Sequence, residues 1–60
     1  MKNKFQVGDL VEIPNNISFR SGEKFGLVIG YKQYRWETGI TILWNTGNIF
    51  SIDPRDLRKL

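Results

Sequence analysis

The sequence contains no cysteine and no histidine among its 60 residues. Without cysteine the chain cannot form a disulfide framework, a thiolate nucleophile or a thiolate metal site. Without histidine it also lacks the imidazole base and the commonest nitrogen ligand for metals. These two absences exclude most of the chemistries used by small enzymes. We therefore predict a non-enzymatic protein that uses no metal and no cofactor.

Other catalytic patterns are also missing. None of the six carboxylates stands beside a recognisable nucleophile pattern, and none shows the spacing of a calcium-binding loop. The glycines do not form a phosphate-binding or dinucleotide-binding motif. Asp9 and Asp53 instead stand in positions typical of a turn and of a helix start, which predicts structural roles for both.

Long apolar runs are absent as well. No unbroken run is longer than that of residues 27–29, whereas a helix that crosses a bilayer needs about 20 apolar residues. Residues 1–4 are polar and basic, but Gly8 and Asp9 interrupt the sequence before any apolar stretch of signal-peptide length. We expect no membrane insertion and a cytoplasmic protein.

The length and charge of the chain limit its fold and its partners. Sixty residues, of which 40% are hydrophobic, fit one small domain spanning residues 1–60. A core of this size rarely gives more than about 3–5 kcal/mol of net stability. Nine Lys and Arg residues against six Asp and Glu residues give a net charge of +3, which favours weak attraction to polyanions.

What the sequence does contain is a series of short β-branched segments separated by glycine, proline and asparagine. We expect the first strand within residues 7–13, because Pro14 cannot donate to a sheet ladder and ends it. Residues 14–24 have the composition of a long irregular loop. A second strand is predicted over residues 25–34.

Strict alternation divides this second strand between two faces of the sheet. One face receives Leu27, Ile29 and Tyr31, and the other receives Gly26, Val28 and Gly30. Two glycines at alternate positions remove side chains from one face, which allows the sharp bending that a small barrel needs.

A β-hairpin is predicted over residues 40–52. Apolar residues alternate along its first strand, and the Asn-Thr-Gly-Asn segment at 45–48 is typical of a hairpin turn. Trp44 lies near the end of that strand and is expected in the core, the usual place for a large aromatic in a strand.

The segment after the hairpin carries a helix-start signal. Asp53 has the character of a cap, Pro54 fits the first helical position and Asp56 closes the capping box. We expect one turn of 3-10 helix there and a short last strand within residues 57–60. The sequence thus predicts an all-β domain of five strands, with a one-turn 3-10 helix before the last strand.

Four segments of the chain resemble a known group of proteins. They are FQVGDLVEI at residues 5–13, GEKFGLVI at 22–29, TILWNTG at 41–47 and IDPRDL at 52–57. Together they resemble the small SH3-like barrels, a group that includes KOW domains, Tudor-like domains and short phage-encoded barrel proteins. The resemblance covers nearly the whole chain and implies a single five-stranded SH3-like barrel.

The same resemblance implies a binding module without fixing its ligand. KOW and Tudor-like relatives bind RNA, DNA, ribosomal or polymerase surfaces, or modified peptide side chains, and some phage members belong to virions. Fold and function are separable in such small barrels. The ligand must therefore be argued from individual side chains.

The best candidate surface is a cluster of aromatic and basic residues late in the second strand. It consists of Tyr31, Lys32, Tyr34, Arg35 and Trp36. Aromatic rings in such a cluster stack on bases while the cations meet phosphates. Tyr34 and Trp36 are the expected main contacts because they fall at a predicted turn. The structural alternative is that Tyr31 faces the core and Trp36 covers an open barrel end.

A second candidate patch combines Arg20 and Lys24 with Phe19. The resemblance implies that this loop borders the ligand groove of SH3-like barrels. The alternative is that Phe19 only anchors a long loop. An aromatic cage of the Tudor type is a further interpretation, and it requires the rings of Tyr31, Trp36 and Trp44 to converge on one open end.

Two functions are consistent with these residues. The first is nucleic-acid binding with weak sequence preference, and its predicted contacts are Arg20, Lys24, Lys32, Tyr34, Arg35 and Trp36. The alternative is a protein–protein interaction module or a virion component, including self-association into a homo-oligomer, because a small core gains stability when exposed aromatics are covered. A phage-encoded protein of this kind would act in the cytoplasm of its bacterial host or in the virion.

Overall fold

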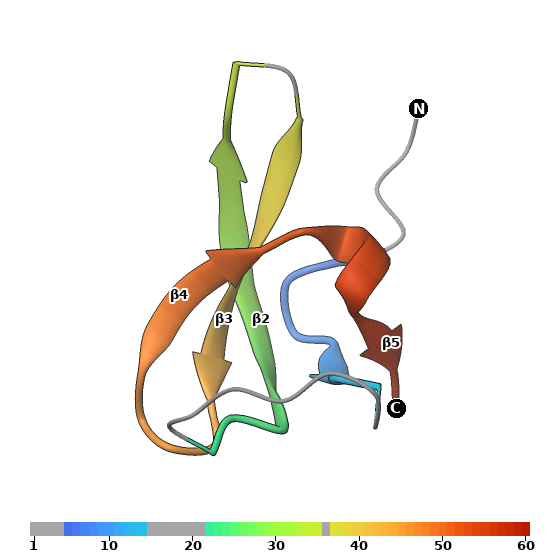
Figure 1. The fold of residues 1–60 in the computed structure, drawn as a ribbon, viewed down its shortest axis with the longest axis vertical. Helices are drawn as coiled ribbons and strands as arrows, with labels where there is room; N and C mark the ends of the chain where they lie inside the picture. Colours follow the sequence, from blue (N-terminus) through green and yellow to red (C-terminus); the bar gives the residue numbers. More distant parts are fainter. Residues whose placement is uncertain (1–4, 15–21, 36) are drawn as a thin grey trace.

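The computed structural model describes residues 5–14, 22–35 and 37–60, which form five β-strands and one 3-10 turn (Figure 1). The elements are β1 (Leu10–Glu12), β2 (Phe25–Gln33), β3 (Thr38–Trp44), β4 (Ile49–Ile52), the 3-10 turn η1 (Pro54–Asp56) and β5 (Arg58–Lys59). The predicted all-β class is therefore confirmed, as is the 3-10 turn before the last strand.

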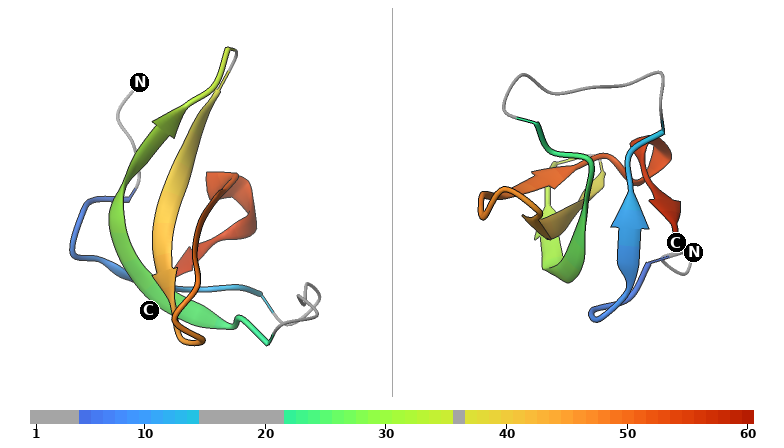
Figure 2. Two further views of the ribbon diagram at one scale, coloured as in Figure 1. Left: turned by 90° about the vertical axis from the view of Figure 1, so that its left-hand side faces the viewer. Right: turned by 90° about the horizontal axis from the view of Figure 1, so that it is seen from below.

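All five strands belong to one antiparallel sheet with the order β4-β3-β2-β1-β5. β2 and β3 are long and curved, and their hairpin projects beyond the rest of the molecule (Figures 1 and 2). β4 and β5 are the two edges of the sheet. No pairing joins these two edges in the described part of the chain, so the sheet is not closed there.

One apolar cluster packs against one side of this sheet. Its buried members are Phe5, Val11, Ile13, Val28, Ile40, Ile42, Trp44 and Leu57. The ring of Trp44 is only 2% exposed and stacks on the ring of Phe50, with 5.0 Å between the centroids. The prediction that Trp44 belongs to the core is confirmed.

A bulge in β2 changes which side chains share a face, so the predicted division of this strand between two faces does not hold. Val28 is buried, whereas Leu27 is exposed. The register against β3 shifts between Val28 and Gly30, so Ile29 is an extra residue in β2. An extra residue of this kind breaks the strict alternation of side chains between the two faces. Tyr31 therefore pairs with the buried residue Ile40. The predicted grouping of Tyr31 with Leu27 on one face is wrong for this reason.

The turn that leads into β1 is held by Asp9. Gly8 adopts a positive φ of 99°, a conformation that glycine reaches without steric strain. The Asp9 carboxylate accepts a hydrogen bond from the Gln6 amide at 2.8 Å and lies 3.4 Å from the Lys59 ammonium. The hydrogen bond from Gln6, helped by Lys59, lowers the pKa of Asp9 below its ordinary value.

Asp53 caps η1 as the sequence predicts. Its Oδ1 accepts a hydrogen bond from the Arg55 amide at 2.8 Å, and Pro54 is the first residue of the turn. The Arg55 guanidinium lies 2.6 Å from the Oδ2 atom of Asp53. Hydrogen bonds from the side chain and the amide of Arg55 lower the pKa of the Asp53 carboxyl.

These two carboxylates should make the protein less stable in acid. Because their folded-state pKa values lie below the ordinary 3.8, they stabilise the native state above that value, and this stabilisation is lost as the pH falls below it. We expect the Asp9→Asn/Asp53→Asn double variant to have a lower urea midpoint than the wild type at pH 6. The difference between the two midpoints should shrink as the pH is lowered below 3.8, and a difference that does not change with pH would contradict this prediction.

Candidate functional site

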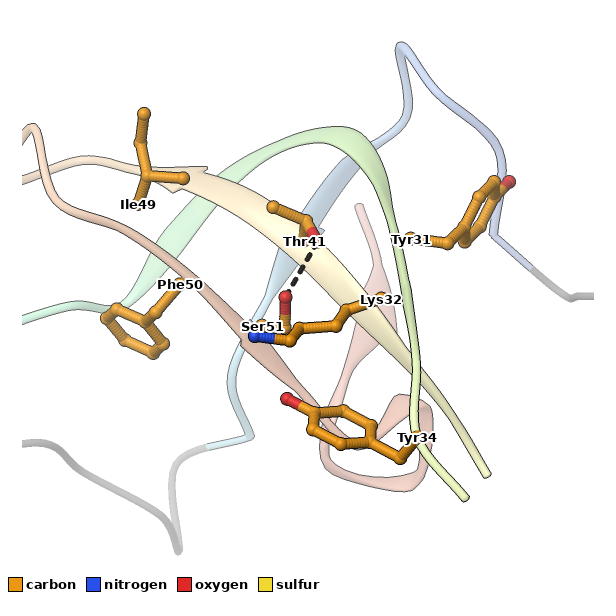
Figure 3. Close-up of a pocket in the computed structure, with 7 residues that line it drawn as sticks. All are labelled: Tyr31, Lys32, Tyr34, Thr41, Ile49, Phe50 and Ser51. Carbon is orange, nitrogen blue, oxygen red and sulfur yellow. Dashed lines mark hydrogen bonds between the residues drawn. The ribbon is translucent and has the colours of Figure 1, made fainter. Parts of the chain in front are cut away.

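An open groove lies where the projecting β2–β3 hairpin meets β4 (Figure 3). Its volume is about 550 Å³, a size found for small-ligand sites. The side chains that line it are Tyr31, Lys32, Tyr34, Thr41, Ile49, Phe50 and Ser51. The groove therefore combines one cation, several aromatic rings and the aliphatic hydroxyl groups of Thr41 and Ser51.

Lys32 and Tyr34 form a cation–aromatic pair on one wall of the groove. The Lys32 ammonium lies 5.9 Å from the centroid of the Tyr34 ring, within the range of a cation–π contact. Both side chains are exposed. The Tyr34 amide donates to the Glu37 carbonyl at 2.8 Å, which closes the turn at the hairpin tip. A positive charge and an aromatic face are thus presented side by side.

A glycine on the neighbouring strand makes room for the Tyr34 ring. Gly39 pairs with Lys32 across the sheet and is buried. A Cβ atom at Gly39 would lie 2.7 Å from Cε2 of Tyr34, closer than side-chain carbons approach one another. The absence of a side chain on Gly39 therefore lets the ring lie against the backbone of β3. Sequence analysis did not identify this role for Gly39.

β3 and β4 form the other wall. The hydroxyl groups of Thr41 and Ser51 hydrogen-bond each other at 2.7 Å across the two strands (Figure 3). Each hydroxyl has remaining capacity to donate or accept. The exposed side chain of Ile49 and the half-buried ring of Phe50 continue this wall as an apolar surface.

Tyr31 differs from Tyr34 in its role. Its hydroxyl donates to the backbone carbonyl of Phe5 at 2.6 Å, and Figure 3 shows its ring directed away from Tyr34. This hydrogen bond ties the hairpin to the N-terminal segment. Trp44 is buried and so contributes no open ring. These positions give no support to the Tudor-type cage.

The structure brings together only part of the predicted site. Lys32 and Tyr34 lie together at the groove, and the exposed Arg35 follows them at the hairpin tip. Lys24 lies just before the opposite end of β2, separated from Lys32 by most of that strand. The remaining predicted contacts lie outside the described residues, and these are Arg20 and Trp36, together with Phe19 of the second patch.

The end of the sheet near Lys24 is organised around a buried carboxylate. Glu23 is 1% exposed, and its Oε2 atom accepts hydrogen bonds from Thr46 Oγ1 at 2.5 Å and Asn48 Nδ2 at 2.7 Å. The side-chain oxygen of Asn45 accepts from the Lys24 amide at 2.9 Å. These bonds join the β3–β4 turn to the segment that enters β2. Nothing local in the sequence indicates this role for Glu23, since Thr46 and Asn48 are more than 20 positions away.

The chain matches no protein-family model, no curated protein and no solved structure. Among the described residues, no group of three or more acidic, histidine or cysteine side chains is arranged to hold a metal ion. No helix in this part of the chain has the length and apolar character needed to cross a membrane. The function must therefore be inferred from the geometry of the groove.

Proposed function

We propose that this protein is a small SH3-like barrel that binds nucleic acid with weak sequence preference. The observation that carries the proposal is the exposed pair of Lys32 and Tyr34, whose charge and ring lie 5.9 Å apart at the edge of the groove. Recognition of single-stranded nucleic acid uses this combination of a cation for phosphate and a ring for a base.

The element order supports the SH3-like part of the proposal. Five antiparallel strands form one curved sheet, and η1 separates the fourth strand from the fifth. This is the arrangement that the four sequence segments of the resemblance imply. A loop edge or a hairpin tip, rather than the core, is then the expected place for ligand contacts.

The binding mode follows from the chemistry of the groove. Phosphate oxygens would meet the cations of Lys32 and Arg35, while a base stacks on the exposed part of the Tyr34 ring. The hydroxyls of Thr41 and Ser51 both donate and accept, so they would tolerate many base or sugar edges. This tolerance is consistent with weak sequence preference. Arg20, Lys24 and Trp36 stay in the proposal as additional predicted contacts.

Two variants separate the charge contribution from the stacking contribution. Arg35→Glu should weaken binding to a mixed-sequence single-stranded 12-mer at least tenfold at 50 mM NaCl. It should also reduce the slope of log K against log [NaCl] by about 0.7, for the one phosphate contact that it removes. Tyr34→Ala should weaken binding roughly 5- to 100-fold and leave the salt slope unchanged, because stacking carries no charge. Fluorescence anisotropy at several salt concentrations measures both effects.

Lys59→Glu is the charge-matched control for Arg35→Glu, and its folding is checked by circular dichroism because it breaks the ion pair of Lys59 with Asp9. It makes the same change of charge on β5, the sheet edge opposite β4, and should weaken binding far less. If Lys59→Glu and Arg35→Glu weaken binding equally, binding depends on the net charge of the protein and the groove is not the site. Undiminished affinity in both Arg35→Glu and Tyr34→Ala would exclude the groove directly.

A protein-interaction function is the second candidate, as a free module or as a virion component. One observation favours it, namely that Leu10, Leu27, Leu43 and Ile49 are all exposed on neighbouring strands. Exposed apolar surface of this extent commonly marks a contact with another molecule.

A further inference from the structure

Five exposed aliphatic side chains form a row across the sheet, and we call them the outer row. The strand register aligns Leu10 with Leu27, Leu27 with Leu43, and Leu43 with Ile49. Leu60 lies beside Leu10, since its amide donates to the Leu10 carbonyl at 3.0 Å. The five residues are between 36% and 67% exposed. Directly paired residues share one face of a sheet, so Leu10, Leu27, Leu43 and Ile49 form a single apolar stripe, with Leu60 next to it.

The outer row is not part of the core. The side chains of the neighbours Val11, Val28 and Ile42 lie on the opposite side of the sheet and are buried in the core. An antiparallel sheet with one solvated face normally carries polar side chains on that face. Phe25 and Ile29, two positions before and after Leu27 along β2, are also exposed and widen the stripe. Seven exposed apolar side chains on and beside this face are not expected for a surface that contacts only solvent.

The outer row carries little charge. Next to it, Glu12 and Arg58 form an ion pair at 2.7 Å, which makes them neutral together. Lys32 lies toward the other end of β2 from Phe25 and Leu27. Two copies of a chain with a net charge of +3 repel each other. The outer row is a part of the surface where they can meet with little of that repulsion.

The area of this surface fits a weak dimer. At about 100 Å² for each fully exposed apolar side chain, the outer row with Phe25 and Ile29 presents roughly 350 Å². Two such surfaces in contact would bury roughly 700 Å² of apolar area, and an interface that is about 60% apolar would then total roughly 1,200 Å². This total is at the lower limit of specific, stable interfaces. An interface of this size is typical of weak, reversible association.

We propose that the outer row binds the outer row of a second copy of this chain across a two-fold axis. A two-fold contact requires a patch that is complementary to itself, and a neutral aliphatic stripe meets this requirement. Lys32 and Tyr34 lie outside the row, while Ile49 belongs to both the row and the groove. The dimer would therefore present two grooves at the margins of its interface.

The oligomeric state in the absence of nucleic acid tests this proposal independently of the proposed function. Sedimentation equilibrium in 0.5 M NaCl, between 10 µM and 1 mM protein, should give a mass that rises from 7.0 kDa toward twice that value. The Leu10→Lys/Ile49→Lys double variant should stay at the monomer mass throughout, because the two-fold axis brings the new charges close together. Val7→Lys changes an equally exposed apolar residue outside the row and should dimerise like the wild type.

Three results would overturn the proposal. The first is a wild-type mass of 7.0 kDa at 1 mM. The second is a dimer that persists in the folded Leu10→Lys/Ile49→Lys variant, because it would indicate pairing of the sheet edges β4 or β5. The third is a set of concentration-dependent amide shifts, in the ¹⁵N-labelled wild type, that is confined to β4 or β5. The proposal instead predicts shifts centred on Leu10, Leu27 and Leu43, and this measurement does not depend on whether a variant folds.

Discussion

Gly26→Ala should remove a large part of the protein's stability. A Cβ atom at Gly26 would lie 2.5 Å from Cγ2 of Ile42 and 2.5 Å from the backbone oxygen of Leu43. The second atom cannot move without shifting β3, which pairs with β2 along most of its length. Overpacking of this kind costs about 1–3 kcal/mol or more, against a total stability of about 3–5 kcal/mol for a core of this size.

Gly30→Ala provides the matched control for this prediction. Gly30 lies in the same strand, and no atom lies within 4 Å of a Cβ placed there. This variant should keep a urea midpoint near that of the wild type, followed by tryptophan fluorescence and far-ultraviolet circular dichroism. Equal stability of Gly26→Ala and Gly30→Ala would show that β2 and β3 do not approach as closely as the structure has them.

The hairpin of β3 and β4 could be predicted from local sequence because its two faces differ. Ile40, Ile42 and Trp44 alternate with Thr41 and Leu43, and the Asn-Thr-Gly-Asn turn follows at once. The buried face of β3 and the register to β4 then follow from the period of a strand. The start of η1 was equally readable, since its cap, Asp53, is local in the sequence.

β2 could not be read in the same way, because both of its faces are apolar. In Leu27, Val28 and Ile29, only Val28 is buried, and the flanking residues are exposed. Periodicity distinguishes a core face from a solvent face only where the second face is polar. The bulge after Val28 adds a shift that the sequence does not signal. Of these two exposed residues, Leu27 belongs to the outer row and Ile29 lies beside it.

The candidate site was predictable where its members are close in the chain. Lys32 and Tyr34 lie on one wall of the groove because they are two positions apart at the end of β2. The opposite wall depends on the β3–β4 register, which pairs Thr41 with Ser51. The resemblance to SH3-like barrels suggests Lys24 as a contact, but most of the length of β2 separates it from Lys32. A set of basic residues chosen from the sequence does not show how far apart they lie along a strand.

Glu23→Ala should be the other strongly destabilising change. The buried carboxylate accepts hydrogen bonds from Thr46 and Asn48, and a hydrogen bond to a charged group contributes about 1.5–3 kcal/mol. Alanine would remove the acceptor and leave a cavity at the point where the β3–β4 turn meets the segment before β2. We expect a loss of about 2–4 kcal/mol, most of the stability available to a core of this size.

Glu23→Gln and Asn48→Ala distinguish the acceptor role of Glu23 from its volume. Glutamine has nearly the same shape and keeps one side-chain oxygen that can accept from Thr46 and Asn48, so it should lose less than half of what alanine loses. Asn48→Ala removes a single donor and should also lose less than Glu23→Ala. If the carboxylate organises the turn, the effects of Glu23→Ala and Asn48→Ala will not add in the double variant, because both remove the same bond. Additive losses would mean that the hydrogen bond from Asn48 is not part of what Glu23 contributes to stability.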